Sequence, residues 1–225
     1  NLTGWMTVFL AQKWATDQLI DNVVSVNIGG EVTEYIKLPD ASYSNPPGIT
    51  TQLQDNGNGA FSLKERFGTQ IDFDSNDRIT QVQDIDGNSL GFTYSNDKLT
   101  LVKDAVGRTL TLNYTDSNLT SVTDSAGRSV SFTYGANLDL VGCTDLGGKL
   151  WTYGYDNQHR MINLQNPLGL TTVSNTYDSL DRVQQQEVPR DGANAIYHFY
   201  FSGFRNVEED PFGRRTAYYL DEKGR

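Results

Sequence analysis

Apolar and polar residues alternate along most of the chain in short segments. Four segments show it most clearly, with apolar residues at Leu90, Phe92 and Tyr94; Leu110, Leu112 and Tyr114; Val130, Phe132 and Tyr134; and Trp151, Tyr153 and Tyr155. A two-residue period rich in aromatic and β-branched residues is typical of a β-strand that buries one face. The pattern therefore predicts a series of strands, each with one apolar face.

A second set of segments carries apolar residues three positions apart. The pairs are Ile79 and Val82, Leu99 and Val102, Leu119 and Val122, and Met161 and Leu164. This spacing does not fit simple alternation, so either a β-bulge or burial on both faces must intervene. Polar segments such as Asp116–Asn118 and Asp156–His159 precede these strands and predict turns.

Glycine recurs with a spacing of about 19 to 23 residues, at Gly68, Gly87, Gly107, Gly127, Gly148, Gly169, Gly192 and Gly213. Most copies end a tetrapeptide that begins with Asp or Asn: Asp84–Gly87, Asp104–Gly107, Asp124–Gly127, Asp145–Gly148, Asn166–Gly169 and Asp210–Gly213. Asp or Asn first, Pro second and Gly fourth are the preferences of a type I turn. Such a turn followed by a left-handed Gly closes a tight hairpin with a bulge.

The repeating unit is therefore strand, turn, strand, tight turn, and it predicts an all-β chain of tandem antiparallel hairpins. An array of about fourteen strands at roughly 4.8 Å each is wide enough that we expect the sheet to curl. The fold class we predict is a curled, spiralling sheet, an open segment of a hollow β-shell. A parallel β-helix has coils of similar length but needs no reversal in each unit, and a propeller of paired units is a weaker alternative.

The chain divides into two regions by pattern. Residues 61–225 hold about seven hairpin repeats, the last of them truncated. Residues 1–60 form a β-rich N-terminal region that leads into the sheet or caps it. Within that region Val23–Val32 and Glu34–Leu38 suggest strands, with turn residues at Gly29-Gly30 and Ser44–Gly48. Phe9–Leu19 fits a helix or a strand equally well.

Composition narrows the function classes. The chain of 225 residues has 28 acidic and 18 basic side chains and a net charge of −10, which opposes binding to a phosphate backbone. Its 12 Tyr, 10 Phe and 3 Trp predict a folded chain. A single cysteine excludes an internal disulfide framework, and no run of about 18 apolar residues predicts a transmembrane span. No signal peptide is visible in this sequence.

The candidate reactive groups have simpler explanations. His159 stands where Asp77 and Asp181 stand in other copies, so we expect a solvated turn residue rather than a general base. His198 lies in an aromatic run and is expected in a strand. Cys143 replaces an apolar core residue, and reactivity would need a nearby base or cation. We therefore predict no catalytic residue and no cofactor site.

Oxygen-rich loops and exposed aromatics are the remaining candidates. Asp84–Asn88 and Asp55–Gly59 resemble calcium loops but lack the later bidentate Glu, and turn chemistry already explains the first of them. We therefore predict no metal site. Cross-strand packing is the simpler interpretation of the tyrosines, although sugar stacking stays open; these are Tyr153, Tyr155, Tyr197, Tyr200, Tyr218 and Tyr219.

Several copies resemble the YD repeat of the RHS family. Tyr155-Asp156 is followed by His159-Arg160-Met161, and Tyr177-Asp178 by Asp181-Arg182-Val183. Phe73-Asp74 through Arg78-Ile79 is a close variant, and Asp210–Gly213 matches the family's Asp-Pro-x-Gly turn. Tyr94, Tyr114 and Tyr134 depart from the pattern because no Asp follows them. The resemblance covers residues 60–225 strongly and extends to the Asp55–Gly59 turn and Phe61–Leu63.

The resemblance implies a spiralling β-shell. In bacterial RHS and insecticidal toxin complex proteins such a shell encloses a C-terminal toxic domain, and in teneurins a similar barrel serves in adhesion. We therefore expect a non-catalytic shell segment, secreted or on a bacterial cell surface. Its expected partners are the remaining repeats and core of the same polypeptide and an enclosed toxin domain, with no nucleic acid. The alternative is an adhesion module that binds carbohydrate or a protein receptor through an aromatic face.

Overall fold

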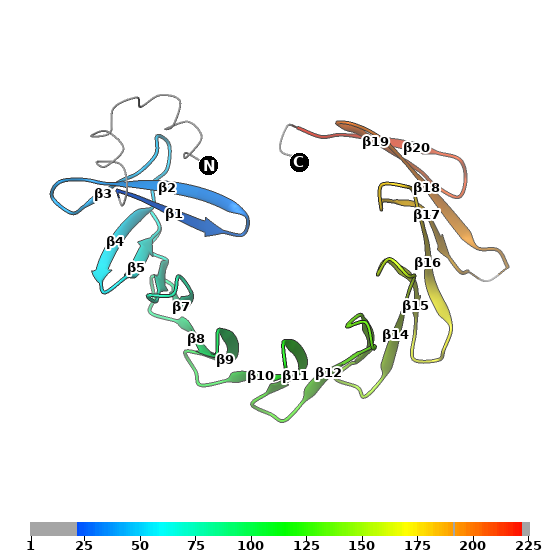
Figure 1. The fold of residues 1–225 in the computed structure, drawn as a ribbon, viewed down its shortest axis with the longest axis horizontal. Helices are drawn as coiled ribbons and strands as arrows, with labels where there is room; N and C mark the ends of the chain where they lie inside the picture. The colour runs from blue at the N-terminus through cyan, green and yellow to red at the C-terminus, as the bar shows by residue number, and fades with distance from the viewer. Residues whose placement is uncertain (1–21, 191, 222–225) are drawn as a thin grey trace. The chain divides into compact units, whose positions relative to one another are not determined.

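The computed structural model describes residues 22–190 and 192–221, and in this part of the chain the regular elements are all strands (Figure 1). The chain forms two compact units, residues 1–111 and 112–225, and each is described by itself. Phe9–Leu19 lies outside the described residues. No helix in the described part is long and apolar enough to cross a membrane.

A small three-stranded sheet begins the first unit. It consists of β1 (Val23–Ile28), β2 (Glu31–Lys37) and β3 (Tyr43–Ser44), in that order. The first two strands pair antiparallel, with Ile28 opposite Glu31, around a turn at Gly29 and Gly30. The turn predicted at Gly29-Gly30 is confirmed, because both glycines adopt the left-handed conformation that an L side chain resists, and the first strand accordingly ends at Ile28.

From β4 onward, hairpins follow one another along the chain (Figure 1). In the first unit the strands are β4 (Gln52–Gly57), β5 (Ala60–Lys64), β6 (Gln70–Phe73), β7 (Ile79–Gln83), β8 (Ser89–Ser95) and β9 (Lys98–Asp104). Each pairs antiparallel with the next, and β10 (Thr109–Thr115) pairs with β9 through Thr109–Thr111. This order confirms tandem antiparallel hairpins and excludes a parallel β-helix for these strands.

The second unit repeats the arrangement. Its strands are β11 (Asn118–Asp124), β12 (Ser129–Tyr134), β13 (Leu140–Thr144), β14 (Leu150–Tyr155), β15 (Met161–Gln165), β16 (Thr171–Tyr177), β17 (Val183–Val188), β18 (Ala195–Ser202), β19 (Arg205–Glu209) and β20 (Arg215–Tyr219). Every neighbouring pair from β11 to β20 is antiparallel.

β-Bulges account for the apolar residues three positions apart. Between β6 and β7 the register passes from Gln81 to Ile79, so Thr80 is an extra residue without a partner position. That extra residue turns Ile79 to the face that also carries Val82. The Thr80 hydroxyl donates a hydrogen bond to the Asp72 carbonyl at 3.2 Å. In the next hairpin Thr100 is the extra residue, and its hydroxyl donates to the carbonyl of Thr93.

The sheet has one apolar and one polar face in each unit. In the first unit Leu53, Leu63, Ile71 and Val82 lie opposite one another on adjacent strands and share a face. The neighbouring positions carry Gln, Ser, Lys and Asp; these are Gln52, Gln54, Ser62, Lys64, Gln70, Asp72, Gln81 and Gln83. A sheet with one face packed and the other solvated is typical of antiparallel strands.

The well-buried core of the described residues is small. Tyr35 is only 1% exposed, and it packs with Val26, Leu53, Leu63 and Ile71 where the first small sheet meets β4 to β6. Beyond this cluster most apolar side chains on the strands are half-buried. Beyond this cluster each described hairpin is therefore one layer of sheet whose apolar face stays partly exposed.

Glycine at the fourth turn position is required by the backbone. Gly107 has a φ of +90°, and an added Cβ there would meet no other atom within 4 Å, so conformation alone excludes a side chain. Gly107→Val should lower the free energy of unfolding by about 1–3 kcal/mol. Urea denaturation measures this loss. Gly91→Val is the matched control, because Gly91 lies in β8 without a positive φ and with its nearest atom 3.9 Å from an added Cβ. Equal free energies of unfolding for the two variants would contradict the turn assignment.

Candidate functional site

One five-residue turn is the unit from which the chain is built, and the turn that starts at Asp124 shows its geometry. The Gly127 amide donates to the Asp124 carbonyl at 3.0 Å, and the Asp124 amide donates to the Arg128 carbonyl at 2.9 Å. The Asp124 carboxylate accepts from the amides of Ala126 and Arg128, both at 2.9 Å. Its second oxygen accepts from Arg128 Nε at 2.7 Å. One carboxylate thus satisfies two turn amides and holds the guanidinium.

The same backbone hydrogen bonds recur at both ends of the hairpins. The turns that repeat them begin at Glu65, Asp74, Asp84, Asp104, Asp124, Gly135, Asp145, Asp156, Asn166, Asp178 and Asp210. In four of these turns the fourth residue is not glycine, yet it has the same left-handed conformation. These residues are Asp77, Leu138, His159 and Asp181, with φ between +60° and +65°. The two kinds of turn are therefore one structure.

An arginine follows the fourth turn residue in six copies and pairs with the first. The pairs are Asp74–Arg78, Asp104–Arg108, Asp124–Arg128, Asp156–Arg160, Asp178–Arg182 and Asp210–Arg214, with N–O distances of 2.6–2.7 Å. Sequence reasoning treated this arginine only as part of a family motif and missed its partner. The signal was present, because Asp and Arg recur four residues apart.

These contacts stabilise the charged form of each carboxyl. Hydrogen bonds from the Arg128 amide and then from its side chain lower the pKa of Asp124. At Asp178 the side-chain hydrogen bond from Arg182 is the largest cause of a lowered pKa. Hydrogen bonds to the ionised form favour that form, so the turns are strongest when the carboxyls carry charge.

The arginine also connects one hairpin to the next. The Arg78 guanidinium lies 4.8 Å from the Tyr94 ring centroid and pairs with Asp97 at 2.9 Å. Tyr94 donates its hydroxyl hydrogen to the Ile79 carbonyl at 2.9 Å. We call this arrangement, in which an arginine stacks on a tyrosine of the next hairpin, the arginine–tyrosine clamp. It explains why a tyrosine recurs at the end of one strand of each repeat.

The clamp recurs in the second unit. Arg160 lies 4.7 Å from the Tyr177 ring and pairs with Asp181 at 2.7 Å, while Tyr177 donates to the Met161 carbonyl at 2.7 Å. Variants keep part of it, since Arg182 stacks on Phe201 at 4.5 Å and Tyr134 donates to the Leu119 carbonyl. Each copy links residues about one repeat apart in sequence. Cation–π contacts are worth about 0.5–1 kcal/mol at exposed sites, and repetition multiplies that contribution.

The two histidines do not form a catalytic arrangement. His159 is the left-handed residue of an exposed turn, and its Nδ1 lies 3.0 Å from Asp139. His198 lies in β18, tilted against the Tyr200 ring at 6.5 Å and opposite Glu209. The hydrogen-bond partner of the His159 ring is thus a carboxylate and not a nucleophile.

Cys143 and the oxygen-rich loops occupy structural positions. Cys143 is half-buried in β13 between Phe132 and Trp151, as expected of a residue on the apolar face. The Asp84 carboxylate accepts from the amides of Asp86 and Asn88 and from the Asn88 side chain. Asp55 accepts from the Gly57 amide and pairs with Lys37. The described residues contain no group of three His, Cys, Asp or Glu placed to hold a metal.

The tyrosines considered for sugar stacking separate into two groups. Tyr153, Tyr155 and Tyr197 are partly buried, and burial raises the pKa of the first two. Tyr200, Tyr218 and Tyr219 are exposed. A hollow of about 280 Å³ lies beside Tyr200 and is lined also by Arg205, Val207, Arg215 and Ala217. Arg215 pairs with Glu209 at 2.6 Å and stacks on Tyr200, so the aromatic surface is partly occupied by the chain's own cations.

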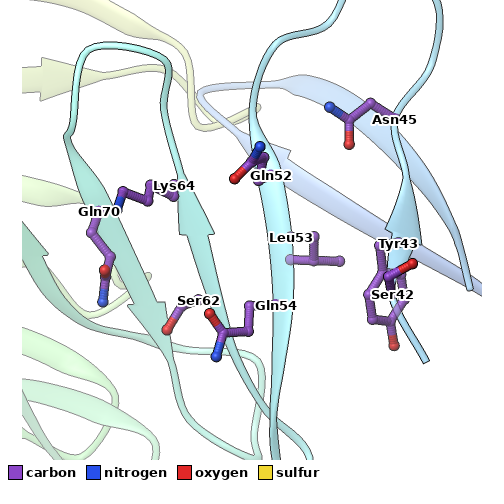
Figure 2. A pocket seen from close by; sticks show the side chains of 9 residues that line it. All are labelled: Ser42, Tyr43, Asn45, Gln52, Leu53, Gln54, Ser62, Lys64 and Gln70. Carbon is purple, nitrogen blue, oxygen red and sulfur yellow. The ribbon is translucent and has the colours of Figure 1, made fainter. Parts of the chain in front are cut away.

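A larger hollow lies over the polar face of β4 to β6, beside β3 (Figure 2). Its volume is about 610 Å³, and Gln52, Gln54, Lys64 and Gln70 line it together with Tyr43. Ser62, also in its wall, donates to Asp72 and accepts from Asn56. The lining has no histidine or cysteine and one cation, so it offers hydrogen bonds but no nucleophile held by a base.

An all-β chain of tandem antiparallel hairpins linked by arginine–tyrosine clamps is a β-hairpin repeat protein in architecture. The family model described as Teneurin YD-shell matches residues 62–201. The chain therefore belongs to the teneurin YD-shell family, which confirms the YD-repeat resemblance. No curated protein sequence matches the chain.

Three solved structures are similar to the chain at low identity. A crystal structure of TcdB2-TccC3-Cdc42 has 11% identity and a TM-score of 0.42, over 84% of this chain and 14% of that one. The Photorhabdus luminescens Tc holotoxin pore, with a TccC3 mutation, has 12% identity and a TM-score of 0.39, over 93% and 14%. A porin-like protein from Bacteroides uniformis has 14% identity and a TM-score of 0.31, over 69% and 60%. The chain thus spans about a seventh of the first two structures.

The lowered carboxyl pKa values predict a specific loss of stability in acid. A carboxyl with a depressed folded-state pKa contributes stability above its unfolded pKa of about 3.9, and that stability is lost as the pH falls through the folded value. The stabilisation of the parent over Asp124→Asn should therefore be complete at neutral pH and shrink as the pH falls below about 4. Urea denaturation of both proteins at several pH values measures the difference.

The asparagine variant is a matched control for turn geometry. Asn166 begins a natural turn of the same kind, and its side-chain oxygen accepts from the amides of Leu168 and Leu170. Asp124→Asn thus keeps the turn and removes the charge that holds Arg128. A free-energy difference that stays constant down to about pH 2 would show that the ionised carboxyl does not stabilise the turn.

Proposed function

We propose that the chain is a non-catalytic structural segment of a large RHS/YD-repeat protein, where it builds part of a β-sheet shell around a C-terminal toxin or effector domain. Family membership supports a shell segment. The observation that carries the proposal is the repeated Asp–Arg turn with its clamp. The residues that recur in the sequence contact one another and join one hairpin to the next.

The sheet is suited to a wall. Each hairpin is a single layer with a polar and an apolar face, and most of its apolar side chains are only half-buried. A compact enzyme domain would cover that apolar face with a second layer of its own. The partners of this segment are then the remaining repeats and core of the same polypeptide and the enclosed domain. The compartment that fits this role is the bacterial cell surface or the secreted fraction.

The alternative function is adhesion through carbohydrate or a protein receptor. The exposed Tyr200, Tyr218 and Tyr219 favour it, because aromatic side chains form stacking platforms. Against it, Tyr200 lies under Arg215 and Tyr219 lies near Arg205. A glycan array separates the two functions, since reproducible micromolar binding that is lost in Tyr219→Ala would favour adhesion.

Protease protection tests enclosure in the full-length polypeptide that contains this segment. An enclosed C-terminal domain should resist a protease that cleaves the same domain readily when it is expressed alone. A combined Gly107→Val and Gly127→Val variant should open the wall and raise the cleavage rate by about tenfold or more, because protection follows the population of open forms.

Gly91→Val in the same polypeptide is the control, and its cleavage rate should match that of the parent. Equal cleavage of the C-terminal domain in the parent and in isolation would contradict enclosure.

A further inference from the structure

Two asparagines of the second unit each begin the short motif Asn-x-Thr. Asn113 is followed by Thr115 in β10, and Asn118 is followed by Thr120 in β11. With a residue other than proline in the middle, this motif is the acceptor sequence for N-linked oligosaccharides in exported proteins. A third copy, at Asn1–Thr3, lies outside the described residues.

The two motifs differ in the residue that stands two positions before the asparagine. Asp116 takes that place before Asn118, whereas Thr111 takes it before Asn113. Bacterial oligosaccharyltransferases bind an acidic residue at this position together with the Asn-x-Thr motif, because its charge pairs with a cationic side chain of the enzyme. The sequence Asp116–Thr120 therefore meets a requirement that the motif at Asn113 does not.

The structure places this sequence at the end of a hairpin. β10 ends at Thr115 and β11 begins at Asn118, so Asp116 and Ser117 alone form the loop between them. Both loop residues are exposed, and Asp116 adopts the left-handed conformation with a φ of +50°. The ends of elements open more readily than their centres. The acceptor thus lies where an enzyme can reach the backbone.

The side chain of Asn118 is free to carry a sugar. It is half-buried, and it has no hydrogen-bond partner among the residues that the structure describes. Asn113 lies inside β10, where its side-chain amide donates to the Ser121 hydroxyl at 3.1 Å. The Asn113 carbonyl accepts from the Thr120 hydroxyl at 3.1 Å. Since the transferase must bind that hydroxyl, transfer takes place before β10 and β11 pair, while the chain is being exported.

We propose that Asn118 is a site of N-glycosylation, modified by an oligosaccharyltransferase that recognises Asp116 and Thr120. In the reaction Asn118 Nδ2 forms a bond to the anomeric carbon of a lipid-diphosphate-linked oligosaccharide. The bond from that carbon to the diphosphate oxygen breaks, and the lipid diphosphate leaves with the electron pair. The amide nitrogen gives one proton to a base of the enzyme. Because such enzymes act on exported chains, the inference rests on the proposed location of the protein outside the cytoplasm.

A glycan on Asn118 is compatible with a wall built from this sheet. Successive side chains of a strand point to opposite faces, so Asn118 lies on the face opposite to that of its neighbour Leu119. The sugar would therefore extend from the polar side at the edge of the hairpin. The apolar side, which carries Leu119, stays free for contacts within the polypeptide.

Intact-mass spectrometry of the exported chain tests the inference. The chain is expressed behind a cleavable signal sequence in bacteria that contain an acid-requiring oligosaccharyltransferase and its lipid-linked oligosaccharide. A flexible Asp-x-Asn-x-Thr tail shows that the enzyme is active. One glycan besides that of the tail is expected, and peptide mapping should locate it on Asn118. Asn118→Gln should abolish it. Asp116→Asn keeps a residue that tolerates the left-handed conformation and should lower occupancy at least about tenfold.

Asn113→Gln is the matched control, because it removes the motif that lacks the acidic residue, and it should leave occupancy unchanged. A parent that carries only the tail glycan would overturn the inference. So would a second glycan that persists in Asn118→Gln, or full occupancy in Asp116→Asn. Because export is imposed in this experiment, none of these outcomes bears on the natural location of the protein or on enclosure of a C-terminal domain.

Discussion

One ionised carboxylate at the start of most of the repeated turns holds the structure together. In the turn that starts at Asp124 it accepts two turn amides and one guanidinium, and copies of that turn close hairpins at both edges. Strand pairing alone does not fix where a chain reverses, because a one-residue slip moves every side chain to the other face. The turn fixes that register, and each strand's apolar face follows from it.

The arginine of the turn extends this local constraint across repeats. Arg78 contacts its own turn through Asp74 and the next hairpin through Tyr94 and Asp97. Stability in such an array is approximately a sum of repeat terms and nearest-neighbour terms, and the clamp supplies the neighbour term. A wall one layer thick, which gains little from a deep core, depends on that term more than a compact domain does.

The hairpins and their turn type could be predicted because their chemistry lies within four consecutive residues. The turn at Asp104–Gly107 can be recognised from its residue types alone. Leu138 takes the same left-handed conformation, although leucine does not favour it. The bulge at Thr80 was undecidable from the Ile79–Val82 spacing, because burial on both faces gives the same pattern. The Asp–Arg pair was visible as a spacing of four residues, but its link to Tyr94 depends on which strands become neighbours. The exposed aromatic surface was a candidate from sequence, and only the folded structure reveals that the Arg215 guanidinium lies 5.9 Å from the Tyr200 ring.

The most direct test of the shared turn is the stability of Leu138→Gly. Leu138 has a φ of +65° and a mostly exposed side chain, so replacement removes backbone strain and little buried surface. The left-handed conformation costs a non-glycine residue about 1–2 kcal/mol, and glycine's extra unfolded-state entropy offsets part of the gain. Urea denaturation should therefore show the variant to be more stable than the parent by about 0.5–1 kcal/mol. A variant less stable than the parent would mean that this turn does not require the left-handed residue, and the account of one turn repeated along both edges would fail.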